Sequence, residues 1–158
     1  MELKKICLFL FLSINFISYG QKVEKVEIDD LEKLLNQSSD KVLIFNFWAT
    51  WCKPCIKEIP AFEEINSTRS EDAKVYLVSI DFKNQYDNRV VPFVEDKGIK
   101  SQVLFLDEDN PNIWMPRISN EWSGAIPSTL FIYNKKKYFV EKEFTLEELN
   151  EYINKLRK

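Results

Sequence analysis

The chain has 158 residues, with 22 Lys and Arg residues against 25 Asp and Glu residues, and it contains no histidine. The net charge of −3 argues against partners that present a phosphate backbone, such as nucleic acids. The lack of histidine excludes Ser-His and Cys-His catalysis, most zinc sites and haem ligation by histidine.

The first twenty residues have the layout of a secretory signal peptide. Lys4 and Lys5 precede an apolar run over residues 6–17, and a short polar close ends at Gly20. A membrane-spanning helix needs about 20 mostly apolar residues, so we predict cleavage after Gly20 and one mature domain over residues 21–158. An uncleaved anchor is the alternative, and either form places the domain in the periplasm or cell envelope. A lipid anchor on Cys7 is disfavoured because no small-residue cleavage site precedes that cysteine.

The mature segment begins with alternating strand and helix patterns. Residues 23–28 alternate apolar and polar side chains and predict a half-buried strand. Asp29, followed three residues later by Glu32, predicts a capping box that opens a helix. The nearly continuous bulky run over residues 42–48 predicts a central strand covered on both faces, and residues 53–67 predict the next helix.

The second half adds more strands and a final helix. We predict a strand over residues 75–80, a helix over 90–97 that stops at Gly98, and a strand over 103–106. Residues 107–124, with Pro111, Trp114, Pro116 and Trp122, are predicted to be irregular. A hairpin over residues 129–133 and 138–143 follows, and Thr145 with Glu148 predicts a capping box for the last helix. This order indicates an α/β fold, a mixed sheet flanked by helices in a single domain, with the parallel part first.

Cys52 and Cys55 are the only cysteines of the predicted mature chain. A zinc or iron–sulfur site needs about four protein ligands, which this segment lacks. Covalent haem attachment needs a histidine directly after the second cysteine, where Ile56 stands. A purely structural disulfide across so short a loop would restrain the unfolded chain little. Redox chemistry is therefore the favoured interpretation.

The residues around the pair support that interpretation. A strand runs into Trp51-Cys52 and a helix runs out, which puts the Cys52 sulfur at a helix N-terminus, where free N–H groups and the helix dipole stabilise a thiolate. Lys53 adds a positive charge, and Pro54 suits the first helical turn. We therefore predict that Cys52 is the nucleophile and that Cys55, the more buried thiol, is the resolving cysteine.

Residues 45–55, which end in Trp-Cys-Lys-Pro-Cys, resemble the thioredoxin superfamily. Together with residues 56–60, residues 124–129 and the export signal, they resemble the TlpA/ResA-like envelope thioredoxins. The resemblance implies a thioredoxin fold and a thiol-disulfide oxidoreductase without a cofactor or metal. It also implies disulfide-containing protein clients and an upstream dithiol electron donor associated with the membrane. Cytochrome c maturation and repair of oxidised proteins are both roles that the resemblance allows.

The same resemblance assigns further site residues. Pro127 matches a cis proline that faces the active disulfide, and Ile126 would then offer its backbone to an extended client segment. Glu58 matches a carboxylate three residues after the second cysteine, one helical turn along. The sequence leaves open whether Glu58 is a buried proton handler or a solvated helix residue. Asn46 stands where cytoplasmic thioredoxins have a buried Asp, and an amide cannot shuttle a proton.

The aromatic residues near the site have weaker interpretations. Trp51 is expected to pack beside the cysteines and shape the surface that meets the substrate, with plain core packing as the alternative. Trp114, Met115 and Trp122 are expected to pack in the core rather than form a substrate rim.

The working hypothesis is a reductase of envelope-protein disulfides. An oxidase or isomerase would use the same residues at a different reduction potential. The sequence also allows a Cu(I)-binding protein of the same fold, because two soft thiolates can hold that ion. A peptide-binding module without turnover would be consistent with the same fold as well.

Overall fold

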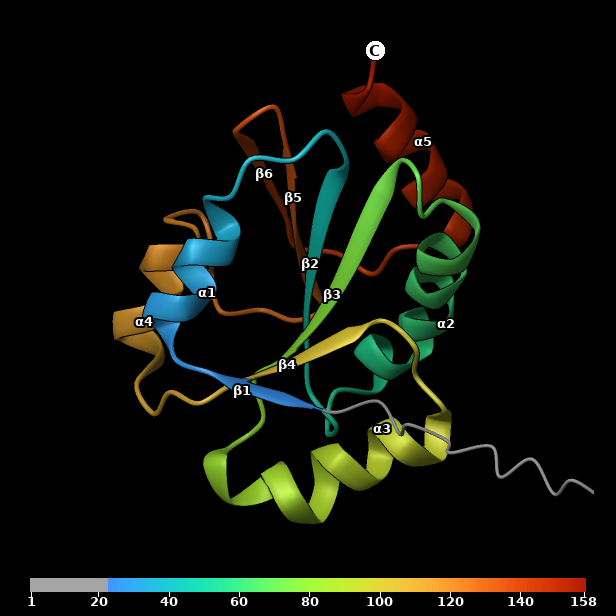
Figure 1. Ribbon diagram of the computed structural model, residues 1–158. Helices are drawn as coiled ribbons and strands as arrows, with labels where there is room; N and C mark the ends of the chain where they lie inside the picture. The colour runs from blue at the N-terminus through green and yellow to red at the C-terminus, as the bar shows by residue number, and fades with distance from the viewer. Residues whose placement is uncertain (1–22) are drawn as a thin grey trace, which may run out of the picture.

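The computed structural model describes residues 23–158, which form one six-stranded sheet with helices on both faces (Figure 1). The predicted signal peptide, residues 1–20, lies outside the described residues. The strands are β1 (Glu24–Val26), β2 (Val42–Trp48), β3 (Ala73–Ser79), β4 (Gln102–Leu106), β5 (Ser128–Tyr133) and β6 (Lys136–Val140). The helices are α1 (Ile28–Leu35), α2 (Lys53–Thr68), α3 (Val91–Lys97), α4 (Pro111–Ile118) and α5 (Leu146–Leu156), and a 3₁₀ turn (Lys83–Gln85) and a π turn (Tyr86–Val90) lead into α3.

The strand order across the sheet is β1-β4-β3-β2-β5-β6. The first four of these strands are parallel, whereas β5 runs antiparallel to β2 and forms a hairpin with β6. This confirms the predicted mixed sheet with its parallel part first. Within residues 23–158, no helix is long and apolar enough to cross a membrane.

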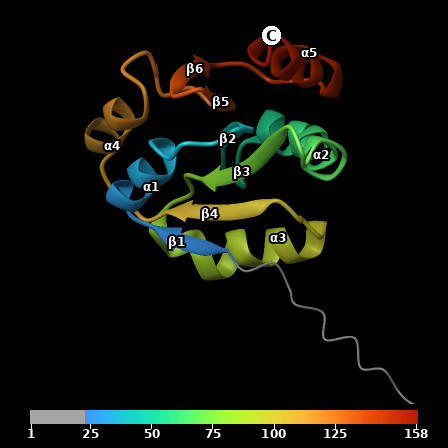
Figure 2. The same cartoon turned by 45° about the horizontal axis from the view of Figure 1, so that its top comes forward.

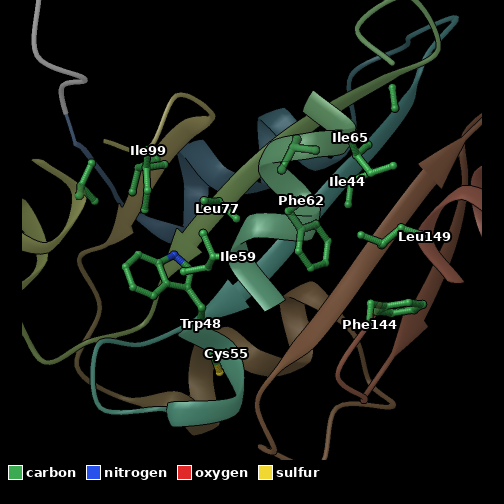
Figure 3. Close-up of a cluster of buried hydrophobic side chains, with 14 of the residues drawn as sticks. Ile44, Trp48, Cys55, Ile59, Phe62, Ile65, Leu77, Ile99, Phe144 and Leu149 are labelled. Atoms are coloured by element: carbon green, nitrogen blue, oxygen red, sulfur yellow. The ribbon is translucent and has the colours of Figure 1, made fainter. Parts of the chain in front are cut away.

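Strand β2 lies in the middle of the sheet and is buried along its whole length, as its bulky sequence predicts. Alternate side chains of a strand point to opposite faces, so Ile44 and Trp48 join one core cluster and Phe45 and Phe47 join the other. The first cluster lies under α2, α3 and α5, where Figure 3 shows Ile59 beside Trp48. Helices α1 and α4 cover the second, on the opposite face (Figure 2).

The ends of two helices agree with their local signals. Gly98 ends α3 in the left-handed conformation, with a φ of 60°, which a residue without a Cβ adopts at no steric cost. Thr145 and Glu148 form the predicted capping box at the start of α5, each side chain bonding the other residue's backbone N–H.

The predicted boundary between β1 and α1 and the predicted capping box there are wrong. Helix α1 begins at Ile28 rather than after Asp29, and its N-cap Glu27 makes no side-chain cap. Glu32 instead accepts two hydrogen bonds from Arg117 of α4, a partner 85 residues away. Strand β1 is correspondingly short, because the backbone N–H of Ile28 already donates to the Glu108 carboxylate.

The segment predicted to be irregular contains helix α4. The Asn110 side chain caps it, and Pro111 occupies the first turn, where a missing N–H costs nothing. Pro116 lies inside the helix only two residues before its end. The packing of Trp114 and Ile118 against the sheet stabilises this short helix.

The hairpin turn is also shorter than predicted. Asn134 and Lys135 alone form it, both with positive φ, so β6 begins at Lys136 and ends at Val140.

Candidate active site

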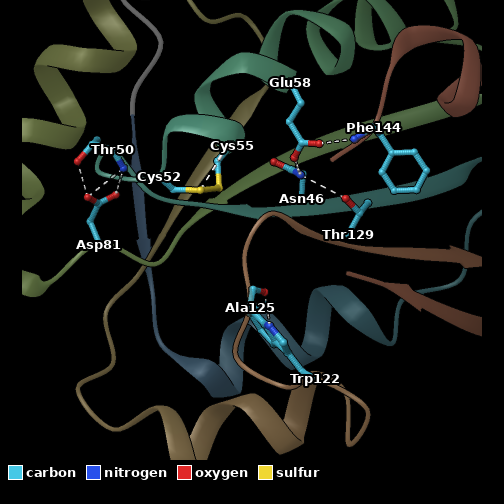
Figure 4. Close-up of a disulfide and its surroundings, with 10 residues drawn as sticks. All are labelled: Asn46, Thr50, Cys52, Cys55, Glu58, Asp81, Trp122, Ala125, Thr129 and Phe144. Atoms are coloured by element: carbon cyan, nitrogen blue, oxygen red, sulfur yellow. Dashed lines mark hydrogen bonds between the residues drawn. A yellow bond between two sulfur atoms is a disulfide. The ribbon is translucent and has the colours of Figure 1, made fainter. Parts of the chain in front are cut away.

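The two cysteines form a disulfide at the junction of β2 and α2 (Figure 4). Cys52 is the N-cap of α2, and its Sγ accepts a hydrogen bond of 3.3 Å from the backbone N–H of Cys55. Cys55 is fully buried, whereas Cys52 retains 6% of its surface. The cysteine with access to solvent is thus also the one whose sulfur faces the unsatisfied N–H groups of the helix N-terminus.

The residues that flank the pair differ in exposure. Pro54 lies in the first turn of α2, as predicted. Trp51 is 51% exposed, which excludes the alternative of plain core packing. Its ring therefore forms part of the surface beside Cys52.

Glu58 lies one turn along α2 from Cys55 and is buried, with 2% of its surface exposed. Its Oε1 accepts a hydrogen bond of 2.7 Å from Asn46 Nδ2, and its Oε2 accepts one of 2.7 Å from the backbone N–H of Phe144 (Figure 4). The same Asn46 Nδ2 contacts Thr129 Oγ1 at 3.2 Å. The solvated-glutamate alternative is therefore wrong, and the carboxyl bridges α2, β2 and the loop before α5.

Burial raises the pKa of Glu58 from its ordinary value of 4.5 to about 7. The hydrogen bonds from Phe144 and Asn46 favour the ionised carboxylate and oppose that rise, and the neighbouring charge of Glu143 adds to it. A pKa near neutrality suits a group that both accepts and returns a proton.

A second buried carboxylate holds the loop that precedes Cys52. Asp81, two residues after the end of β3, accepts hydrogen bonds from the backbone N–H of Thr50 at 3.0 and 3.1 Å and from Thr50 Oγ1. Ser79 Oγ donates a further bond of 2.8 Å to Asp81. Since Asp81 is only 3% exposed, these donors satisfy a charge that would otherwise be costly to bury. They also join the end of β3 to the active-site loop.

The segment before β5 completes the site. The peptide bond between Ile126 and Pro127 is cis, as the resemblance predicts. Ile126 packs against the core cluster that contains Cys52 and Cys55. The indole N–H of Trp122 donates a 2.9 Å hydrogen bond to the carbonyl of Ala125, which fixes the approach to the proline.

A family model described as the AhpC/TSA family matches residues 15–138 of the chain. The chain belongs to the AhpC/TSA family. The chain is also 31% identical to thiol-disulfide oxidoreductase ResA of Bacillus thuringiensis strain Al Hakam, over 90% of this chain and 75% of that protein. ResA of Bacillus anthracis gives the same values. These relatives and the Cys52–Cys55 pair make this AhpC/TSA member a thiol-disulfide oxidoreductase.

Solved structures confirm the fold of this AhpC/TSA member. A thioredoxin-related protein from Neisseria meningitidis serogroup B superimposes with a TM-score of 0.63 at 21% identity, covering 76% of this chain and 87% of that one. StoA from Bacillus subtilis gives a TM-score of 0.55 at 20% identity, covering 73% and 84%. The thioredoxin-like fold predicted from the sequence is therefore confirmed.

Sequence reasoning missed three partners of this family member's site: Asp81, Thr129 and the backbone of Phe144. Asp81 carried a usable signal, because an acidic residue directly after a buried strand lies at the edge where the parallel strands end. Thr129 and Phe144 carried none, since their contacts with Asn46 and Glu58 span 83 and 86 residues.

The aromatic residues before the cis proline lie in the core. Trp114 and Trp122 are buried and pack edge to face, and Met115 packs against the same cluster. The prediction of core packing is confirmed for these three residues.

Proposed function

We propose that the protein reduces disulfides of envelope proteins through the dithiol form of Cys52 and Cys55. The observation that carries the proposal is the pair at the N-terminus of α2, with a buried carboxyl one turn further along. The Cys52 thiolate attacks a client disulfide, so that a Cys52–client bond forms and the second client sulfur leaves as a thiolate that takes up a proton. When the exchange is complete, two electrons have passed to the client, and the protein ends as the disulfide seen in the structure.

Resolution of the mixed disulfide requires Cys55 to lose its proton. In this proposal Glu58, in its ionised form, accepts that proton, and the Cys55 thiolate attacks Cys52 Sγ and releases the client as a thiolate. The raised pKa of Glu58 supports this role. Asn46 holds the carboxyl in place but does not itself carry the proton.

The client would lie across Trp51 and the cis proline. The backbone of Ile126 would pair with an extended client segment, and Trp51 and Pro54 would contact its side chains. An upstream dithiol donor associated with the membrane would then return Cys52 and Cys55 to the reduced state. Removal of residues 1–20 during export would leave residues 21–158 as the working domain, which the intact mass of the exported protein tests.

A trapping experiment tests the exchange chemistry. Cys55→Ser should accumulate mixed disulfides with client proteins, because the Cys52–client bond then has no resolving thiol. Cys52→Ser is the matched control and should trap nothing. Recovery of equal amounts of client on both variants, or of none on either, would contradict the assignment of nucleophile and resolving cysteine.

A further inference from the structure

Four large apolar side chains are strongly exposed within residues 23–158: Trp51, Phe82, Ile113 and Leu146. The first three follow β2, β3 and β4 in the chain, and the carboxyl ends of parallel strands meet at one edge of a sheet. Leu146 begins α5, on the opposite face of the sheet from α4 (Figure 1). Exposed apolar side chains that follow three neighbouring strands favour an interaction surface at this edge over scattered exposure.

Of these four residues, Phe82 lines a pocket of about 310 Å³ between the loop after β3 and the start of α4. Ile80, Phe82, Pro111 and Trp114 form its apolar lining, and we call it the Phe82 pocket. Its volume is at the lower end of the range of small-ligand sites, about 300–1,000 Å³. It therefore suits one or two amino-acid side chains.

The Asp81 carboxylate connects the Phe82 pocket to the loop that carries Cys52. Asp81 is a lining residue, and it binds the backbone N–H and hydroxyl of Thr50, two residues before Cys52 (Figure 4). An extended chain advances about 3.3 Å per residue. A polypeptide whose cysteine meets Cys52 can thus reach the pocket within a few residues.

The charges around the Phe82 pocket are predominantly negative. Its lining includes the carboxylates of Asp81, Glu108 and Asp109 and a single cation, Lys83. Lys83 pairs with Asp109 at 3.2 Å and with Asp107 at 3.4 Å, so its charge is already balanced. The excess of carboxylates around the pocket therefore favours a ligand that carries a basic side chain.

We propose that the Phe82 pocket binds an apolar side chain of the disulfide-bearing client, next to a Lys or Arg of the same segment and a few residues from the client cysteine. This inference rests on the proposed function, because it names the sequence class of the clients that Cys52 attacks. It adds a specificity site on the α4 side of the disulfide that is separate from the cis-proline segment.

Three short peptides test the proposal, each with one cysteine held as a mixed disulfide with thionitrobenzoate. A Leu-Lys pair, a Leu-Glu pair or a Ser-Ser pair stands three residues from the cysteine. The reduced protein attacks the peptide sulfur through Cys52, and the release of the thionitrobenzoate thiolate gives the second-order rate constant. We expect the Leu-Lys peptide to react about tenfold faster than the Ser-Ser peptide, with the Leu-Glu peptide between them.

Two variants locate the preference. Phe82→Ser should reduce the ratio of the Leu-Lys to the Ser-Ser rate constant to about one, while Leu146→Ser, the matched removal of an exposed apolar side chain, should leave that ratio unchanged. Equal rate constants for the three peptides on the wild-type protein would overturn the proposed role of the Phe82 pocket but not the redox function. An equal loss of selectivity in both variants would do the same. No reaction with any peptide would overturn the proposed function and the pocket together.

Discussion

Replacing Glu58 by Gln should remove a pH dependence of folding stability that the wild-type protein has between about pH 4.5 and 7. The native carboxyl keeps its proton until the pH approaches a pKa of about 7, whereas in the unfolded chain it ionises near 4.5. In this window the unfolded state binds fewer protons than the native state, so the free energy of unfolding falls as pH rises. The contribution is fully present below about pH 4.5 and lost above about pH 7.

The size of the effect follows from the difference between the two pKa values. At about 1.36 kcal/mol per pKa unit, the shift from 4.5 to about 7 corresponds to about 3 kcal/mol. Gln is a suitable mimic of the protonated carboxyl. Its carbonyl can accept the bond from the Phe144 N–H, and its amide can donate to Asn46 Oδ1, a buried oxygen without a hydrogen-bond partner in the structure, once the Asn46 amide turns over.

Urea unfolding of the oxidised protein, at intervals of about one pH unit from about pH 4 to 8, measures the effect. The oxidised form is used because its cysteines do not titrate. The difference in free energy of unfolding between the wild type and Glu58→Gln should fall by about 3 kcal/mol as the pH rises from about 4.5 to 7. Glu151→Gln, at an exposed position of α5, is the control and should run parallel to the wild type. Parallel curves for Glu58→Gln and wild type would refute the argument that burial of this carboxyl sets its pKa.

Three further predictions concern the scaffold, and urea unfolding at neutral pH checks each. Asp81→Ala should destabilise the protein by about 2–3 kcal/mol, because it leaves the Thr50 N–H and the buried Ser79 hydroxyl without this acceptor. A change below about 0.5 kcal/mol would show that the active-site loop does not depend on the Asp81 carboxylate. Thr145→Ala should lower the free energy of unfolding by about 1 kcal/mol, because the capping box is lost. Glu27→Ala, at an N-cap without a side-chain bond, should change that free energy little. Equal effects of the two substitutions would contradict the assigned caps. Trp122→Ala should lower the free energy of unfolding by about 3–5 kcal/mol and Trp51→Ala by less than about 0.5 kcal/mol, because the indole of Trp122 is buried and that of Trp51 is exposed. The reverse order would contradict the placement of both rings.

The parts of the fold that could be predicted from the sequence are those with local causes. The bulky run of β2 needs two covered faces, and the helices on both sides of the sheet cover them. The Cys-Lys-Pro-Cys segment places a sulfur at a helix N-terminus through the chain geometry of four adjacent residues. The capping box of Thr145 likewise involves residues three apart.

The errors arose where distant contacts overrule a local signal. Glu32 has the spacing of a capping residue, but the guanidinium of Arg117 binds it instead. Helix α4 forms despite the internal Pro116 because Trp114 and Ile118 bury their side chains against the sheet. The burial of Glu58, which the sequence left open, involves the backbone of Phe144, which the chain brings back after the β5–β6 hairpin.

The reduction potential of the Cys52–Cys55 pair tests the reductase assignment most directly. Equilibration of the protein with defined ratios of reduced and oxidised thiol buffer, followed by alkylation of the free thiols, gives the value. A reductase should have a reducing potential, below about −200 mV and in the range of thioredoxins and glutaredoxins. A value near about −120 mV, typical of a strong oxidant, would contradict the assignment.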